Sequence, residues 1–241
     1  MFDRRFITDV VLSTHIGRES YLNTLPVIAH LQKHKSLPIT SDITFFVGEN
    51  GTGKSTLLEA IAVASGFNAE SGTKNFYYAT NNTHSKLHEH ITLAKSKYPK
   101  DGFFLRAESF YNAATYIDEV GAAGSYGGKS LHSQSHGESF MSLVQNRFRS
   151  DSLFLLDEPE AALSPLKLMT LMVEISSLIK QNCQFIIATH SPILMTFPNA
   201  LIYEFSENGI VSVDYRQTEH YRITRGYLEN PERMLKYLLE E

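Results

Sequence analysis

Residues Gly48 to Ser55 (Gly-Glu-Asn-Gly-Thr-Gly-Lys-Ser) have the residue types and spacing of a loop that wraps nucleotide phosphates, G-x-x-x-x-G-K-[ST]. Glycines let backbone N–H groups turn toward the phosphates, and the start of the following helix adds partial positive charge. Lys54 would bring a point charge to the β and γ phosphates, and the Ser55 hydroxyl could ligate Mg²⁺. We therefore predict a nucleoside triphosphate site formed by Asn50, Gly51, Thr52, Gly53, Lys54, Ser55 and Thr56.

The segments on either side of this loop support the same interpretation. Residues 43–47 (Ile-Thr-Phe-Phe-Val) have the composition of a buried strand, and residues 56–62 have the composition of a helix. A strand before the loop and a helix after it form the structural context that the motif requires.

Two carboxylates follow a second apolar segment. Asp157 and Glu158 come directly after Leu153-Phe154-Leu155-Leu156, which has the pattern of a strand covered on both faces. Ligands in α/β sheets bind at the carboxyl ends of strands, so both acids should face the phosphate loop. We predict that Asp157 binds Mg²⁺ and that Glu158 is the general base that takes a proton from an attacking water.

His190 ends a third apolar segment, Phe185 to Thr189, in the same way. A histidine at that position could donate a hydrogen bond to the γ-phosphate or orient the attacking water. We predict a catalytic role for it.

The segment Gln134-Ser135-His136-Gly137-Glu138-Ser139 precedes a helical pattern over 138–148. Ser135 can cap that helix, Gly137 permits close backbone approach, and a helix N-terminus favours an anion. Within one molecule, this second anion site has no obvious partner.

Composition limits the class of protein. Hydrophobic residues make up 42% of the 241 residues and charged residues 20%, as in ordinary globular domains. The net charge of −4 gives no support to a nucleic-acid partner, although one stays possible. The lone Cys183 suits a reducing cytoplasm, and the absence of a signal peptide or of an 18-residue apolar run predicts a cytoplasmic chain without membrane insertion.

Strands that alternate with helices predict an α/β fold with a largely parallel sheet. The expected strands span 6–12, 43–47, 102–106, 153–156 and 185–189, followed by a hairpin of 202–205 and 210–213. The expected helices span 22–33, 56–62, 138–148, a segment opened by Ser164-Pro165, and 231–239. Residues 66–100 are polar and 121–128 are glycine-rich, so we expect surface structure there.

Taken together, these motifs resemble an ABC-class P-loop ATPase. Gly48–Ser55 is similar to Walker A, Leu153–Pro159 to Walker B, Ser135–Glu138 to the signature motif LSGGQ, Ala161–Ser164 to the D-loop, and His190 to the switch histidine. The resemblance implies ATP and Mg²⁺ as ligands, ATP hydrolysis, and a head-to-tail homodimer. In that dimer Ser135 and Gly137 of one chain would contact ATP held by the other. It also implies one ATPase domain over 1–241, with an inserted helical subdomain at about 66–150 that carries the signature.

Some positions depart from the transporter pattern. His136 replaces a signature glycine, Glu138 replaces the usual glutamine, and Ser164 stands where the D-loop usually has aspartate. Glu108 is our candidate for the Q-loop glutamine, because it follows a short strand. The Walker B and Thr189-His190-Ser191-Pro192 phrases look more like soluble ABC ATPases, the group that includes chromosome-maintenance and recombinational-repair ATPases and small predicted bacterial ATPases.

Three other functions stay open at this point. The chain could be the ATPase subunit of a transporter, a P-loop kinase with a small acceptor, or a clamp for DNA or a protein that uses ATP hydrolysis to reset. The kinase reading leaves Ser135–Glu138 and His190 without a role.

Four further groups have residue types that bind ligands in other proteins, and we interpret them as surface or packing residues. They are the histidines His84, His88 and His90, the tyrosines Tyr77, Tyr78, Tyr111 and Tyr116, the pair Arg18 and Tyr21, and the C-terminal cluster His220, Tyr221, Arg222 and Arg225.

Overall fold

A central sheet forms the middle of the molecule. The computed structural model describes residues 4–69, 71–73, 85–110, 115 and 131–239, and within them six strands pair in the order β5-β6-β7-β3-β8-β9. These strands are β3 (Ile43–Gly48), β5 (Asp101–Arg106), β6 (Ser152–Asp157), β7 (Gln184–Ala188), β8 (Leu201–Ser206) and β9 (Gly209–Ser212). All neighbours are parallel except β8 and β9, which form the hairpin predicted around Asn208-Gly209. The predicted α/β fold with a largely parallel sheet is confirmed.

The strands β3, β6 and β7 are buried along their whole length. They are apolar on both faces because helices or a second sheet cover both sides. Their register aligns Phe46 with Ala188 and Asp157 with Ala188, so all three strands end at the same edge of the sheet. This edge is where the phosphate loop begins.

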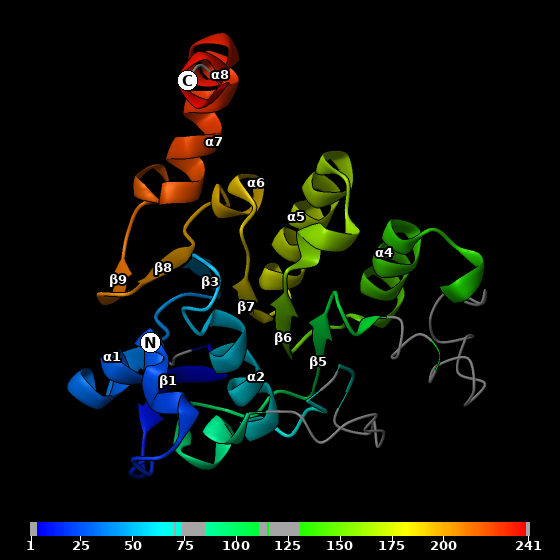
Figure 1. Ribbon diagram of the computed structural model, residues 1–241. Coiled ribbons are helices and arrows are strands. Elements are labelled where there is room, and N and C mark those ends of the chain that lie inside the picture. Colours follow the sequence, from blue (N-terminus) through cyan, green and yellow to red (C-terminus); the bar gives the residue numbers. More distant parts are fainter. Residues whose placement is uncertain (1–3, 70, 74–84, 111–114, 116–130, 240–241) are drawn as a thin grey trace.

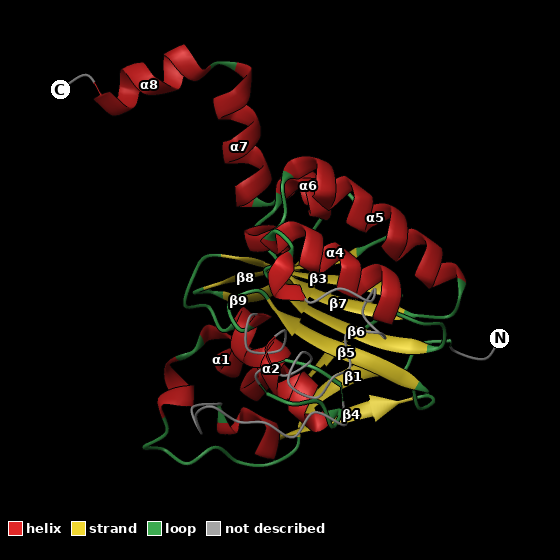
Figure 2. Ribbon diagram, turned by 90° about the vertical axis from the view of Figure 1, so that its right-hand side faces the viewer, coloured by secondary structure: helices red, strands yellow, loops and turns green. Residues whose placement is uncertain are grey.

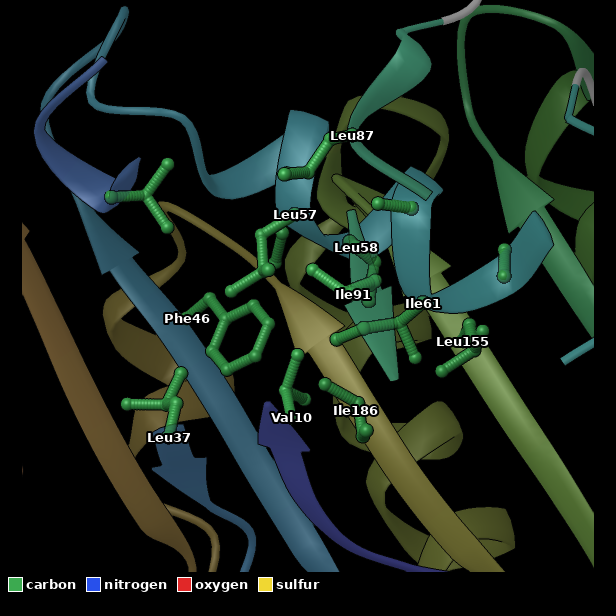
Figure 3. Packing of buried hydrophobic residues seen from close by; sticks show 14 of the residues in the cluster. Val10, Leu37, Phe46, Leu57, Leu58, Ile61, Leu87, Ile91, Leu155 and Ile186 are labelled. Carbon is green, nitrogen blue, oxygen red and sulfur yellow. The ribbon is translucent and has the colours of Figure 1, made fainter. Parts of the chain in front are cut away.

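Helices cover the two faces of the sheet. On one face lie α4 (His136–Arg147), α5 (Pro165–Lys180) and α6 (Pro192–Met195), and on the other lie α1 (Pro26–His34) and α2 (Lys54–Ala64), as Figure 2 shows. Each face has its own hydrophobic core. Figure 3 shows the core under α2, where Leu57, Leu58 and Ile61 pack against Phe46 and Ile186 of the sheet.

A second, smaller sheet packs against the α2 core. It contains β2 (Ser36–Pro38), β1 (Ile7–Leu12) and β4 (Ile91–Lys95) in the order β2-β1-β4, all antiparallel. The strand β4 lies in the polar segment for which we predicted only surface structure. Its burial is partial, and Ile91 is its one fully buried residue, so the apolar signal in the sequence is weak.

The first helix is shorter than the periodicity predicted. A short 3-10 helix, η1 (Tyr21–Thr24), precedes α1, which begins at Pro26 instead of Leu22. Proline lacks a backbone N–H and fits the first helical position, so it starts the helix. The remaining 3-10 helices are η2 (Lys86–Glu89), η4 (Leu131–Ser133), η5 (Pro159–Ala162) and η6 (Tyr215–Gln217).

The C-terminal helices α7 (Glu219–Glu229) and α8 (Pro231–Leu239) extend away from the sheet and its covering helices (Figures 1 and 2). Neither helix buries a residue. No helix among the described residues combines the length and the apolar character that a membrane crossing needs.

The proposed inserted subdomain at about 66–150 is only partly described. That range includes β5, which belongs to the central sheet, and α4, which carries the signature residues at its start. Residues 74–84, 111–114 and 116–130 lie outside the described part. The boundaries of the subdomain therefore stay a prediction.

Candidate nucleotide site

The glycines of the phosphate loop are required by their neighbours as well as by the loop itself. Gly48 has φ +126°, and a Cβ added there would lie 2.1 Å from the carbonyl oxygen of Phe205. Gly53 has φ +95°, and its added Cβ would lie 2.4 Å from Cγ1 of Val27. Both positions need glycine, because a side chain would meet backbone strain and a steric clash together.

Lys54 is buried at the start of α2. Its Nζ donates hydrogen bonds to the carbonyl oxygens of Gly48, at 2.7 Å, and Glu49, at 2.8 Å. Burial lowers its pKa, and the nearby carboxylates of Glu158 and Asp157 oppose that effect. The ammonium therefore lies inside the curve of the loop, where phosphate oxygens would replace the carbonyls as partners.

The rest of the predicted loop residues lie on two sides of α2. Asn50, Gly51 and Thr52 line a cavity that also includes Pro26. Thr56 lines a different cavity of about 290 Å³, next to Ser55 and the two carboxylates after β6. The Thr52 hydroxyl donates to the Glu49 carbonyl oxygen at 2.8 Å and so closes the loop on itself.

Ser55 and Asp157 are joined across 102 residues of sequence. The Ser55 hydroxyl donates to Oδ1 of Asp157 at 2.9 Å, and the Asp157 side chain is only 5% exposed. The two predicted Mg²⁺ ligands are therefore adjacent, at the meeting point of α2 and the end of β6.

Arg106 completes this cluster, and the sequence reasoning missed it. Its Nε donates to Oδ2 of Asp157 at 3.0 Å, and its Nη2 donates to Oε2 of Glu59 on α2 at 3.0 Å. Although burial alone would lower the pKa of Arg106, the charges of Asp157 and Glu59 raise it, so the guanidinium stays charged. Arg106 ends β5 in register with Asp157 on the neighbouring strand, and the sequence does not show this pairing because it depends on which strands are neighbours.

Glu158 has a strained backbone. Its φ of 50° and ψ of 51° lie in the left-handed region, which a non-glycine residue seldom adopts. Its side chain is 38% exposed, and burial together with the charge of Asp157 raises its pKa. Strain of this kind persists where the surrounding structure holds it, and it is concentrated at functional sites.

His190 is held from two directions. Its backbone N–H donates to Oε1 of Glu160 at 2.5 Å, and its Nδ1 lies 2.8 Å from Nε2 of His220. Its Nε2 faces Oε1 of Glu158 at 3.6 Å, which is longer than a hydrogen bond. Burial, and then the charge of Lys54, lower the pKa of His190 to about 4, so the ring is neutral at neutral pH.

The sequence-based interpretation of the C-terminal cluster was wrong for His220. We assigned it to the surface, but it is half-buried and contacts the predicted switch histidine. Arg222 and Arg225 are exposed, as expected. No pattern in the sequence links position 220 to position 190, because the contact depends on where α7 starts.

The cavity beside Ser55 is also lined by two residues whose functional role was less strongly predicted. Glu108, our Q-loop candidate, and Tyr21 both line it, together with Glu158. Arg18 instead lines a separate cavity near Ile16, so Arg18 and Tyr21 do not share a pocket. The role of Glu108 stays a prediction.

The signature residues lie at the exposed start of α4. The Glu138 carboxylate accepts hydrogen bonds from the backbone N–H of Ser135, at 2.9 Å, and from its hydroxyl, at 2.6 Å. Gly137 is buried, and an added Cβ would lie 3.0 Å from the Ala162 carbonyl oxygen and 3.0 Å from Cδ of Lys167. Among the hydrogen bonds, ion pairs and cavities of the described residues, none joins Ser135 or Gly137 to the phosphate loop of the same chain.

The other residues weighed from the sequence have ordinary structural roles where they are described. Ser164 caps α5 by accepting from the Lys167 N–H at 3.4 Å. His88 and His90 contact different partners, the Ser85 carbonyl and the Thr14 hydroxyl. The described part of the chain has no group of three or more His, Cys, Asp or Glu side chains placed to hold a metal. His84, Tyr77, Tyr78, Tyr111 and Tyr116 lie outside the described residues.

Two protein-family models match the chain. Residues 28–117 match an AAA domain, and residues 139–196 match a second AAA domain model, described as a putative AbiEii toxin of a type IV TA system. No curated protein sequence matches the chain.

Several solved structures are similar to the model. A putative metal-chelate type ABC transporter in an inward-facing conformation is 14% identical, with 91% of this chain and 88% of that chain covered, at a TM-score of 0.52. The cbiO1 protein from Clostridium perfringens, part of the ABC transporter complex cbiONQ, is 15% identical over 98% and 100% of the two chains, at a TM-score of 0.49. The SMC head domain from Thermotoga maritima is 15% identical over 87% and 99%, at a TM-score of 0.46. At such identities the likeness concerns the fold.

The sheet order, the glycine-dependent phosphate loop and the two AAA matches agree with one another. The chain has the fold of ABC ATPases and carries two segments that match AAA domain models, and these matches support ATP hydrolysis as its activity.

Proposed function

We propose that this chain binds MgATP, dimerises head-to-tail around two nucleotides and hydrolyses ATP to ADP and phosphate. The observation that carries the proposal is the convergence of three segments at one edge of the sheet. The start of α2, the end of β6 and the end of β7 bring Ser55, Asp157, Glu158 and His190 together beside the phosphate loop.

Phosphate binding belongs to the loop and to Lys54. The backbone of Asn50 to Thr56 would surround the phosphates with N–H groups, and the start of α2 favours their negative charge. The Lys54 ammonium already lies within the loop, so it needs only to exchange carbonyl partners for phosphate oxygens.

The residues beside the loop fit a magnesium ion. The Ser55 hydroxyl and the Asp157 carboxylate supply two adjacent hard oxygen donors, and Mg²⁺ uses few protein ligands of this type beside phosphate oxygens and water. When bound, the ion would neutralise negative charge that develops on the phosphates during the reaction. Burial raises the pKa of the Asp157 carboxyl, and the Arg106 guanidinium that pairs with it opposes that rise and orients the carboxylate.

Glu158 and His190 would act on the water and the γ-phosphate. Glu158 takes one proton from the water while the water oxygen attacks the γ-phosphorus. The bond between the γ-phosphorus and the β–γ bridging oxygen breaks, and ADP is released. The raised pKa of Glu158 makes it a stronger base than an exposed glutamate. The neutral His190 would donate a hydrogen bond from Nε2 to a γ-phosphate oxygen.

The exposed start of α4 supports the homodimer. Ser135 and the first N–H groups of this helix have no nucleotide partner within the described part of their own chain, yet Gly137 fixes the helix start firmly against η5 and α5. A second copy in head-to-tail orientation would place its bound phosphates at this helix start. Two composite sites would result, with Walker residues from one chain and Ser135 and Gly137 from the other.

The test uses Glu158→Gln, with Glu89→Gln as the matched control because Glu89 is exposed and lines none of the described cavities near the loop. We expect Glu158→Gln to bind ATP but to release phosphate at least about 100-fold more slowly than the wild type. Blocked hydrolysis should trap the dimer, so light scattering after gel filtration should give twice the monomer mass only with MgATP present.

Two results would contradict the proposal. Normal phosphate release by Glu158→Gln would remove Glu158 as the base. A monomeric mass, with ATP shown to be bound, would remove the head-to-tail dimer and leave Ser135 without a nucleotide.

A further inference from the structure

His220 lies in the first turn of α7 and touches the histidine assigned to the γ-phosphate. The distance from its Nε2 to Nδ1 of His190 is 2.8 Å, the ring centroids are 4.8 Å apart, and the ring planes meet at 61°. A contact of this length between two ring nitrogens is a hydrogen bond, and it requires one N–H and one lone pair.

The positions of the protons follow from the remaining ring nitrogens. Nε2 of His190 and Nδ1 of His220 are both buried, and neither has a hydrogen-bond partner within the described part of the chain. A neutral imidazole carries one N–H. If His220 donates to His190, then the single proton of His190 is on Nε2. If His190 donates, then Nε2 of His190 carries a lone pair and Nδ1 of His220 carries a buried N–H without an acceptor.

The surroundings of His190 favour the first arrangement. Its Nε2 faces the Glu158 carboxylate at 3.6 Å, which attracts an N–H and repels a lone pair. Either arrangement leaves one buried N–H and one buried lone pair without a hydrogen bond. In the first arrangement the N–H is the one on His190 that faces a carboxylate, whereas in the second it is on Nδ1 of His220, which has no acceptor within the described part of the chain.

Backbone hydrogen bonds at His190 and next to His220 hold the two rings in place. The His190 N–H donates to Glu160, while the N–H of Glu219, the neighbour of His220, donates to Oε1 of Glu204 on β8 at 2.9 Å. The buried Thr218 caps the turn before α7, and its hydroxyl donates to the Tyr215 carbonyl oxygen at 2.7 Å. The start of α7 is therefore held in place, although the rest of that helix is exposed.

We infer that His220 is a positioning residue, which donates from Nε2 to His190 and fixes His190 as the tautomer with its proton on the nitrogen that faces the γ-phosphate. The inference rests on the proposed function, because only a γ-phosphate at that place gives the fixed proton a task. A histidine in the wrong tautomer would offer a lone pair to the negatively charged phosphate and would lose the hydrogen bond that stabilises the transition state.

The first experiment reads the tautomer directly. Nitrogen-15 NMR of the histidine rings, in the full chain without nucleotide, should show His190 protonated at Nε2, with its signals assigned by their loss in His190→Gln. In His220→Ala the His190 signals should shift toward a mixture of both tautomers. Protonation of His190 at Nδ1 in the wild type, or no change in His220→Ala, would overturn the inference.

The second experiment is kinetic. We expect kcat for ATP hydrolysis to fall about 10–100-fold in His220→Ala with KM changed less than about twofold, because the lost interaction acts in the transition state. His220→Gln retains a side-chain N–H donor and should recover most of kcat. His34→Ala, which removes an exposed histidine at the end of α1, is the matched control and should keep the wild-type kcat. An unchanged kcat in His220→Ala would overturn the inference.

Failure of the inference and failure of the proposed function give different results. If His190→Ala loses activity but His220→Ala does not, His190 keeps its role and the positioning by His220 is wrong. If His190→Ala keeps full activity, the assignment of His190 to the γ-phosphate is wrong, and the NMR result alone then decides whether His220 sets the tautomer.

Discussion

The two segments predicted to bind anions, the phosphate loop and the start of α4, are built differently. Around the phosphate loop, Lys54, Ser55 and Asp157 are buried or half-buried and hydrogen-bonded to one another or to the loop. At the start of α4, Ser135 is exposed, and within the described part of the chain it hydrogen-bonds with its own helix, to Glu138 and Ser139. One segment is organised by residues from three strand ends, whereas the other is organised mostly by itself.

The difference agrees with the proposed function, in which the phosphate loop forms a site within one chain and the start of α4 completes the site of a second chain. The buried cluster has the charges and donors that phosphate and a cation need, while α4 offers a helix start and a serine facing outward. Glu138 keeps Ser135 in place in the single chain, and hydrogen bonds to Ser135 lower the pKa of this exposed carboxyl. The α4 segment is therefore expected to gain its function when a second chain brings a phosphate to it.

The largest expected effect comes from inactivating the two segments in two different variants. Lys54→Ala should abolish nucleotide binding and Ser135→Arg should block the partner's site, so each variant alone should lose at least about 100-fold in hydrolysis rate. A one-to-one mixture restores one intact composite site in each mixed dimer and should recover up to about a quarter of wild-type activity. Phosphate release from the mixture measures this.

Each variant measured alone is the control for that experiment. If the mixture shows no more activity than its separate components, the Walker residues and Ser135 do not act across two chains.

A smaller effect is expected from adding a side chain where α4 packs closely against η5 and α5. Gly137→Ala places a Cβ at 3.0 Å from the Ala162 carbonyl and from Lys167, and we expect a loss of about 1–3 kcal/mol in the free energy of unfolding. Gly226→Ala on α7 is the matched control, since a Cβ there meets nothing within 4 Å. That variant should be neutral or stabilising, by about 0.5–1 kcal/mol. Denaturant unfolding compares the two, and equal values would show that α4 is not tightly seated.

The last expected effect concerns His190 and the pH dependence of stability. Its pKa is about 4 in the folded chain and near its ordinary value of 6.5 in the unfolded chain. Between these values the unfolded state binds more protons, so the contribution of His190 makes stability fall as pH decreases from 6.5 to 4. Relative to His190→Gln, the wild type should lose about 2–3 kcal/mol over that range, with His34→Gln as the control. A constant difference between wild type and variant would contradict the low pKa.

The phosphate loop and the strands beside it were predictable because their signals are local. The loop needs glycines at fixed spacing, and the strands 43–48, 152–157 and 184–188 are mostly apolar and fully buried. The side-by-side strand ends follow from the parallel α/β arrangement, which is why Asp157, Glu158 and His190 could be assigned to one edge before the fold was known. Their roles in catalysis stay predictions.

Partly buried elements were harder to predict. The strand β4 has no clear alternation of apolar and polar residues. It forms because it pairs with β1 as an antiparallel neighbour. The helix α1 begins at Pro26, one turn later than expected. Our prediction gave more weight to the apolar periodicity of residues 22–33 than to this proline.

The sequence by itself determined which chemistry could be predicted for this chain. The phosphate loop, the acids after β6 and the histidine after β7 are recognised from their residue types and short-range spacing. Only the tertiary structure decided which side chains support that chemistry. Arg106 reaches Asp157 across 51 residues and His220 reaches His190 across 30, and each contact depends on where a distant element ends or begins. Such contacts leave no periodic trace in the chain, since they are set by packing of the whole sheet and its helices.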